Sequence, residues 1–235
     1  MLNIVNISKG FGSNKVLSGI STCFKPGEVS FIIGHNGSGK STFLQLISGD
    51  LNPDSGSINF NNETISKNII SKVTQNINLC SERELTVYEN LCIARLKNQK
   101  GKLKTFNFYN EIIDFTNSVE IDTFNFLDKP LKLLSGGEQQ KIALLMGIIS
   151  NPKILLLDEF TSALDPKTSE EILKLVRNLT QALDLITIII SHSLREVAHF
   201  ADRIIMIKDN GIHLDKYYNQ PPSLEDLLVL FEGDI

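Results

Sequence analysis

The chain has 235 residues, of which 42% are hydrophobic and 21% are charged, an ordinary composition for a soluble globular protein with a substantial core. Its net charge of −4 argues against a nucleic-acid-binding protein, because such proteins usually carry a basic face. The strongest apolar run, at residues 185–190, is too short to span a bilayer, so passage through a membrane would require another chain.

The opening third of the chain is predicted to form mostly antiparallel strands. Residues 2–7 alternate between apolar and polar side chains, and residues 16–24 form a second strand-like run after a turn. Residues 28–33 predict an apolar strand, which is followed by a helix that starts near Gly39. Residues 53–62 predict a turn and then an edge strand.

The middle of the chain changes to helical spacing. Residues 86–97 and 108–119 carry apolar side chains at helical intervals. We expect residues 84–133 to form a helical subdomain within a single domain that spans residues 1–235.

The last third alternates helices with continuous apolar strands. The expected elements lie, in turn, at residues 135–150, 153–159, 167–183, 185–191, 194–201 and 203–211. Because helices between such strands cover both faces of a parallel sheet, this third predicts an α/β core. The last of these strands is expected to end in an Asn210-Gly211 turn, and a short helix is expected within residues 222–235.

A glycine-rich stretch, GHNGSGKST at residues 34–42, follows the first apolar strand. It fits the pattern G-x-x-x-x-G-K-[ST], in which backbone N–H groups and a helix N-terminus bind phosphate. Lys40 would reach the β- and γ-phosphates of a nucleoside triphosphate, and Ser41 would hold Mg²⁺. The alternative is a glycine-rich turn that binds no ligand. The residues expected to bind phosphate are Gly34, Asn36, Gly37, Ser38, Gly39, Lys40, Ser41 and Thr42.

Two acidic residues end the apolar strand at residues 153–159. Asp158 would hold Mg²⁺ through its water shell, and Glu159 would act as a general base on the attacking water. The alternative is a strand that merely ends in acidic residues. The phosphate loop in the same chain favours the catalytic interpretation.

A second small-residue stretch, LSGGEQQ at residues 134–140, begins a predicted helix. Free N–H groups, a hydroxyl and the helix dipole make it a candidate anion-binding element. A plain helix cap, with Ser135 and Glu138 as a capping box, explains the same residues. The local physics leaves both interpretations open.

The order of these motifs resembles that of the ATP-binding-cassette (ABC) ATPases. From about Phe11 to Gly211 the chain carries GHNGSGKST, a glutamine loop, LSGGEQQ, ILLLDE, SALD and a strand that ends in histidine. The resemblance implies the P-loop NTPase fold of ABC ATPases, with an antiparallel β subdomain, a parallel-sheet core and a helical subdomain. It also implies ATP and Mg²⁺ as cofactors and a catalytic role for Lys40.

The resemblance assigns roles to four further residues. Phe11 matches an aromatic residue that stacks on adenine, with a core aromatic as the alternative. Gln75 matches the loop residue that senses the γ-phosphate and water and helps to hold Mg²⁺, unless it is an exposed residue at a strand end. Asp165 matches a residue that communicates across a dimer, and it can also cap the next helix. His192 matches the switch histidine that contacts the γ-phosphate.

In ABC ATPases two cassettes pair head to tail. ATP would therefore lie between the phosphate loop of one copy and Ser135, Gly136 and Gly137 of the other, and its binding would shift the dimer to a closed state. The implied partners are a second copy of the chain, an integral-membrane permease subunit and a substrate-binding protein, with no nucleic acid. The implied location is the cytoplasmic face of the plasma membrane.

Several kinds of ABC ATPase fit these motifs. The chain lacks a long coiled-coil insertion, a second cassette and a fused membrane span, and residues 86–91 resemble a segment that lies near the permease in transporters. We expect a separate-subunit bacterial importer. The alternatives are a soluble repair, translation or regulatory ATPase and an exporter or lipid-extraction cassette. Residues 144–147 and the ending PSLEDLLVLFEG resemble tryptophan/tyrosine-type amino-acid uptake systems.

Overall fold

The structure is a computed structural model that describes residues 1–74, 81–96, 108–119, 126–218, 220 and 222–232. The strands are β1 (Leu2–Phe11), β2 (Asn14–Phe24), β3 (Val29–Ile33), β4 (Ser55–Phe60), β5 (Glu63–Thr64), β6 (Ile70–Thr74), β7 (Ile154–Asp158), β8 (Ile186–Ile190), β9 (Arg203–Lys208) and β10 (Gly211–Tyr217). The α-helices are α1 (Lys40–Ser48), α2 (Val87–Leu96), α3 (Phe108–Ser118), α4 (Gly136–Ile148), α5 (Pro166–Ala182), α6 (Leu194–Phe200) and α7 (Leu224–Glu232). The short 3₁₀ helices are η1 (Lys67–Ile69) and η3 (Leu131–Leu133).

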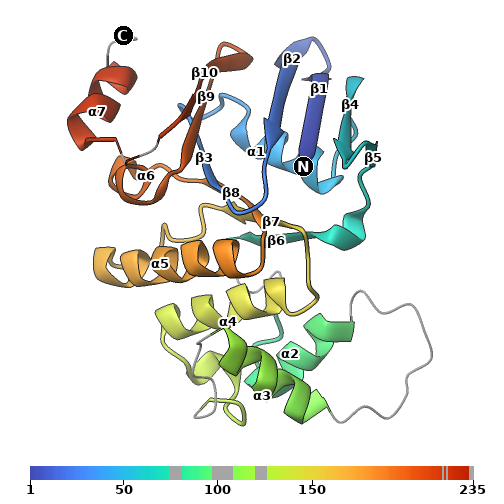
Figure 1. The fold of residues 1–235 in the computed structure, drawn as a ribbon, viewed down its shortest axis with the longest axis vertical. Coiled ribbons are helices and arrows are strands. Elements are labelled where there is room, and N and C mark those ends of the chain that lie inside the picture. The colour runs from blue at the N-terminus through green and yellow to red at the C-terminus, as the bar shows by residue number, and fades with distance from the viewer. Residues whose placement is uncertain (75–80, 97–107, 120–125, 219, 221, 233–235) are drawn as a thin grey trace.

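The first sheet is antiparallel, with the strand order β2-β1-β4-β5 (Figure 1). In β1, Leu2 pairs with Phe24 of β2, and Ile4 pairs with Ile58 of β4. All four are buried, because alternate side chains of a strand face the same side. The predicted antiparallel start is confirmed. The prediction that β4 lies at an edge is wrong, since the two-residue strand β5 pairs with its other side.

The second sheet has the order β10-β9-β3-β8-β7-β6, and its pairings are parallel except for β9 with β10. This confirms the predicted parallel core. The strand β10 was not predicted. Its hairpin turn with β9 is formed by Asp209 and Asn210, whose backbones are both left-handed with φ of 49° and 64°. Gly211 already pairs with Lys208, so the predicted Asn-Gly turn is shifted by one residue.

Two hydrophobic cores lie on opposite faces of the parallel sheet, because successive side chains of a strand point to opposite sides. On one face, Phe43 of α1 shares a core with Leu156 of β7 and with the antiparallel sheet. On the other face, Leu157 of β7 shares a core with Leu145 of α4 and Leu173 of α5. Figure 1 shows α4 and α5 below β6 and β7, and the antiparallel strands β1, β2 and β4 above them.

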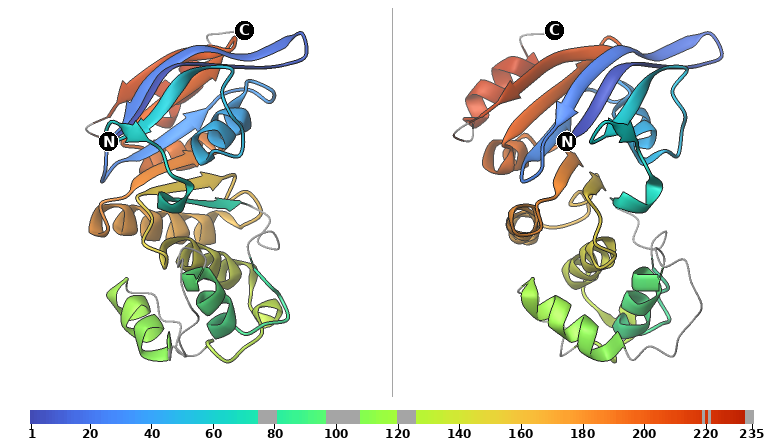
Figure 2. Two further views of the ribbon diagram at one scale, coloured as in Figure 1. Left: turned by 90° about the vertical axis from the view of Figure 1, so that its right-hand side faces the viewer. Right: turned by 45° about the vertical axis from the view of Figure 1, so that its right-hand side comes forward.

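The helices of the middle region lie beyond α4, on its side away from the parallel sheet (Figure 2). Val87 and Leu91 of α2 and Ile112 of α3 are buried in the core that they share with α4. The two helices predicted here are confirmed, with slightly shorter bounds. That residues 84–133 form a separate subdomain stays a prediction. Within the described ranges, no helix has the length and apolar composition that crossing a membrane requires.

Candidate active site

Three neighbouring parallel strands bring the predicted catalytic segments to one edge of the sheet. The strands β3, β8 and β7 lie side by side, and pairing puts Ile32, Ile190 and Asp158 at one level. The phosphate loop follows β3, Glu159 follows β7, and His192 follows β8. Since parallel strands end at the same edge, segments far apart in the sequence meet there.

The phosphate loop, residues 34–42, uses glycine where a side chain would not fit. Gly34 has a left-handed φ of 145°, and a Cβ there would lie 2.3 Å from the carbonyl oxygen of Ile207 in β9. Gly39, with φ of 100°, is the N-cap of α1, which begins at Lys40 as predicted. The loop therefore packs tightly against the sheet at its start and leads directly into a helix N-terminus.

The Lys40 side chain is buried at the base of this loop. Its Nζ donates hydrogen bonds to the carbonyl oxygens of Gly34 and His35, at 2.8 and 2.9 Å. Burial lowers the pKa of Lys40, while the carboxylates of Glu159 and Asp158 act in the opposite direction. The Lys40 ammonium group therefore interacts electrostatically with both Glu159, the predicted general base, and Asp158, a predicted Mg²⁺ ligand.

The Ser38 hydroxyl tests whether the loop fits a phosphate ligand. Its Oγ is buried and has no hydrogen-bond partner in the part of the chain that the structure describes. Buried hydroxyl groups are nearly always paired, so an unpaired one here fits a ligand that supplies oxygen atoms. The neighbouring Gly37 faces open space, since a Cβ there would meet nothing within 4 Å. Both features fit the phosphate groups of ATP.

Asp158 is a partly buried carboxylate at the end of β7. Burial raises its pKa, and smaller effects come from Lys72 and Lys40, which lower it, and from Glu159, which raises it. A carboxylate that is costly to ionise in its surroundings is stabilised by a bound cation. Together with the hydroxyl of Ser41, it offers the hard oxygen ligands that suit Mg²⁺.

Glu159 and His192 come from different strand ends and are hydrogen-bonded, with 3.0 Å between Glu159 Oε1 and His192 Nε2. The backbone of Glu159 is left-handed, with φ of 49°. Such a conformation costs a non-glycine residue about 1–3 kcal/mol and is often found at active sites. The Glu159 amide donates a hydrogen bond of 3.1 Å to the carbonyl of Ile190, which ties the turn after β7 to the end of β8.

The LSGG segment forms a closed capping box at the start of α4. The amide of Ser135 donates to Glu138 Oε2 at 2.7 Å, and its hydroxyl accepts a hydrogen bond from the Glu138 amide. A Cβ on Gly137 would lie 2.6 Å from the Thr168 side chain, so glycine permits close packing of α4 on α5. The cap is confirmed, and it does not use the backbone N–H groups of Gly136 and Gly137.

The remaining predicted residues lie around this centre. Phe11 ends β1 and is 51% exposed, so the alternative of a core aromatic is wrong. Asp165 caps α5 and accepts two amide hydrogen bonds of 3.1 Å from its first turn, which confirms the predicted cap. Gln75 is the next residue after β6 and lies outside the described residues.

One acidic residue near this edge was not predicted. Glu196 of α6 accepts hydrogen bonds from the hydroxyls of Thr161 and Ser191, which belong to the loops after β7 and β8. Its signal in the sequence is the spacing Ser193-x-x-Glu196, which is typical of a local capping box and gives no sign of contact between loops.

The sequence resembles known transport proteins over its whole length. Residues 17–162 match the pattern of a family described as ABC transporter. A tyrosine transport ATP-binding protein of Clostridioides difficile is 34% identical over 99% of this chain and 99% of its own length. The methionine import ATP-binding protein MetN of Clostridium acetobutylicum is 31% identical, over 100% of this chain and 76% of that protein.

Solved structures with the same fold are also cassettes. The protein cbiO1 of Clostridium perfringens, part of the ABC transporter complex cbiONQ, has a TM-score of 0.83 at 26% identity and covers 99% of this chain and 92% of its own. A dimeric bacterial ABC transporter cassette has a TM-score of 0.76 at 26% identity, with 92% of this chain and 98% of that chain covered.

Proposed function

The chain belongs to the ABC transporter family as an ATP-hydrolysing subunit, and from this premise we propose that it drives the uptake of an aromatic amino acid such as tyrosine. The observation that carries the proposal is the 34% identity with a tyrosine transport ATP-binding protein over 99% of both chains. The methionine import relative is less similar, and the match covers only 76% of its length.

The phosphate loop binds the phosphates of ATP, and the ring of Phe11 stacks on the adenine. The unpaired Ser38 hydroxyl and the exposure of Phe11 support these roles. Mg²⁺ would supply positive charge to the phosphate oxygens, and Ser41, Gln75 and Asp158 would hold it. The raised pKa of Asp158, which burial causes, supports a cation at this position.

Glu159 is the general base of hydrolysis. Its carboxylate orients a water molecule and accepts a proton from it as the water oxygen attacks the γ-phosphorus. His192 holds this carboxylate through the 3.0 Å hydrogen bond and contacts the γ-phosphate. Lys40 stabilises the negative charge that develops on the phosphate oxygens. The strained backbone of Glu159 supports its assignment to the reaction.

A second, head-to-tail copy of the chain completes each ATP site. The phosphate loop leads into α1, and Ser135 caps α4. These two helices pack in different cores, on opposite faces of the parallel sheet. This separation favours a site built from two chains, as does the similarity to a dimeric cassette. Ser135, Gly136 and Gly137 of one copy then contact the ATP that the other copy holds.

The permease binds at a cavity of about 610 Å³ between β6, α2 and α4. Ile93 of α2 lines this cavity and is 50% exposed, and Met146 of α4 adds a second apolar side chain. An apolar helix of the permease suits such a surface, with Lys67 and Lys72 at its polar side. A permease and an external substrate-binding protein complete the system, with this chain at the cytoplasmic face of the membrane.

The transport proposal is tested by deleting this chain in its own cell and measuring the uptake of radiolabelled tyrosine, tryptophan and methionine. A loss of aromatic amino-acid uptake that the intact chain restores, and that a Glu159→Gln chain does not restore, supports the proposal. A loss of methionine uptake alone overturns the proposed substrate.

The proposed partner is tested by purifying the chain from detergent-solubilised membranes. If soluble proteins, ribosomes or nucleic acid copurify with the chain and no multi-span membrane protein does, the proposed partner is overturned.

The chemistry is tested by the substitution Glu159→Gln, which keeps the size of the side chain and removes the base. We expect ATP turnover to fall at least about a hundredfold, because general-base catalysis contributes about 10²–10⁴-fold. ATP binding should persist and should trap a dimer. Phosphate release and size-exclusion chromatography with ATP measure both effects. Normal turnover in this variant contradicts the assignment of the base.

A further inference from the structure

The hydrogen bond between Glu159 and His192 depends on two separate loops. Glu159 follows β7 and His192 follows β8, so their 3.0 Å contact exists only while both loops keep their relative positions. The left-handed backbone of Glu159 is strained, and a strained residue relaxes unless its surroundings hold it. Keeping the hydrogen bond between Glu159 and His192 therefore requires a group that holds both loops in place.

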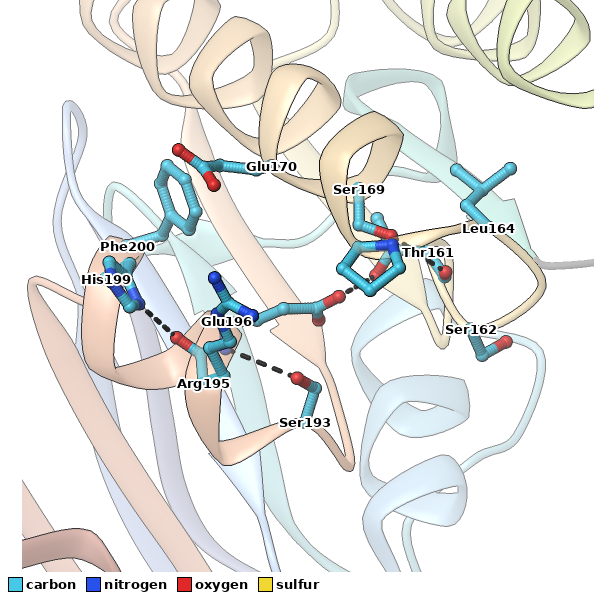
Figure 3. A pocket seen from close by; sticks show the side chains of 11 residues that line it. Thr161, Ser162, Leu164, Ser169, Glu170, Ser193, Arg195, Glu196, His199 and Phe200 are labelled. Carbon is cyan, nitrogen blue, oxygen red and sulfur yellow. Dashed lines mark hydrogen bonds between the residues drawn. The ribbon is translucent and has the colours of Figure 1, made fainter. Parts of the chain in front are cut away.

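The carboxylate of Glu196 contacts both loops. Its Oε1 accepts a hydrogen bond of 2.9 Å from the hydroxyl of Thr161, two residues after Glu159. Its Oε2 accepts one of 2.6 Å from the hydroxyl of Ser191, the residue before His192. Thr161 and Ser191 are both buried. Figure 3 shows the Glu196 side chain reaching from α6 toward Thr161, beside a cavity of about 240 Å³.

The contacts of Glu196 differ from those of an ordinary helix cap. Ser193 caps α6, and Glu196 stands three residues later, where a capping-box glutamate would accept a hydrogen bond from the Ser193 amide. That amide instead donates to Ser191 Oγ at 3.0 Å, and the carboxylate turns to the two loop hydroxyls. The carboxylate thus leaves the local cap and joins the two loops.

We propose that Glu196 is a positioning residue for ATP hydrolysis, which holds the loop of Glu159 and the loop of His192 in register. The inference rests on the proposed roles of Glu159 and His192. Removal of the carboxylate leaves two buried hydroxyls without their acceptor and lets the strained turn at Glu159 relax. The general base then moves relative to its water molecule, while the phosphate loop keeps its structure.

The primary experiment measures ATP turnover and ATP affinity of the purified full chain carrying Glu196→Ala. We expect kcat to fall about 10–100-fold with KM for ATP changed less than about twofold, because small misplacements of catalytic groups cost about that much. Glu170→Ala is the matched control, since Glu170 lines the same cavity but pairs with Lys174 of its own helix. The control should keep the kcat of the unmodified chain.

Two further variants separate positioning from general stability. Glu196→Gln keeps one acceptor oxygen, so its kcat should lie between those of the unmodified chain and Glu196→Ala. Adding Thr161→Val to Glu196→Ala should lower kcat no further, because both changes remove the same contact. If Glu196→Ala fails to fold, the Thr161→Val and Ser191→Ala single variants carry the test, and each should lower kcat with KM unchanged.

The inference is overturned if Glu196→Ala keeps the kcat of the control, if its effect falls on KM, or if the losses in the double variant multiply. The Glu159→Gln variant distinguishes this outcome from a failure of the proposed function. Normal turnover with Glu159→Gln overturns the base assignment itself. Loss of turnover with Glu159→Gln, together with normal kcat in Glu196→Ala, overturns only the positioning role.

Discussion

The glycines of the phosphate loop differ in what a side chain would meet. Gly34 and Gly37 both have left-handed backbones, with φ of 145° and 80°. A Cβ on Gly34 would lie 2.3 Å from the carbonyl oxygen of Ile207, whereas a Cβ on Gly37 would meet nothing within 4 Å. The sequence shows a glycine at both positions and does not distinguish the one that touches the sheet from the one that faces open space.

This difference predicts unequal effects of two alanine substitutions on folding. Gly37→Ala should lower the free energy of unfolding by about 1–2 kcal/mol, the usual cost of a left-handed backbone in an L-residue. Gly34→Ala should lower it by about 1–3 kcal/mol more, because a backbone carbonyl of β9 must also move. Urea denaturation of both variants without nucleotide measures the two values. An equal or larger loss in Gly37→Ala contradicts the role of the contact with Ile207.

At the scale of elements, α4 and α6 begin with the same Ser-x-x-Glu spacing, but the glutamates of the two helices make different contacts. In α4, Ser135 and Glu138 close a local capping box. In α6, Ser193 caps the helix, but Glu196 reaches the loops after β7 and β8. The difference lies in the surroundings, since α6 begins at Leu194, shortly after β8 ends at Ile190, and its Glu196 contacts the loop that follows β7.

The closed box in α4 predicts a pH-dependent contribution to stability. Hydrogen bonds from the Ser135 hydroxyl and amide hold the pKa of Glu138 below its usual value of 4.5. A lowered pKa in the folded state stabilises the protein above the unfolded pKa, and this stabilisation is lost as the pH falls through the folded pKa.

Glu138→Ala should therefore destabilise the chain by about 0.3–1 kcal/mol at pH 7, the usual worth of an acidic residue at a helix N-terminus. The difference from the unmodified chain should shrink as the pH falls below about 4.5. Denaturation curves of both proteins between pH 7 and pH 3 measure it. A difference that grows on acidification is the result that contradicts this account.

At the scale of the whole molecule, the parallel sheet separates two of the predicted binding elements. The helix of the phosphate loop shares a core with the antiparallel sheet on one face, and the helix of Ser135 shares a core with α5 on the other. An ATP site that needs both elements is therefore most simply completed by a second chain. In a head-to-tail dimer each site takes one element from each copy.

This arrangement predicts complementation between two inactive variants. Lys40→Ala damages the phosphate loop and Ser135→Arg damages the LSGG segment, so a dimer of either variant has no intact site. A mixed dimer keeps one intact site, and equal mixing should restore about a quarter of the normal ATPase activity. Phosphate release from the separate and mixed proteins measures it. If the mixture stays inactive, or if one variant alone is active, the site is not divided in this way.

Much of the fold was predictable because its signals are local. Apolar runs located β3, β7, β8 and β9, helical spacing located the helices, and the phosphate-loop pattern located the start of α1. The caps at Ser135 and Asp165 followed from side chains that bond to their own helix. Of the strands that were not predicted, β10 is mostly exposed and lacks the apolar run that marked its neighbours.

The sequence by itself determined the phosphate loop, the acidic strand end and the family, because each depends on residue types at short, fixed spacings. The tertiary structure decided the contacts that depend on strand order and on the register between strands. It paired Asp158 with Ile190, brought Glu159 within 3.0 Å of His192, and turned Glu196 from a local cap to two loops. No local pattern encodes which strands become neighbours, so contacts between their ends appear only in the folded chain.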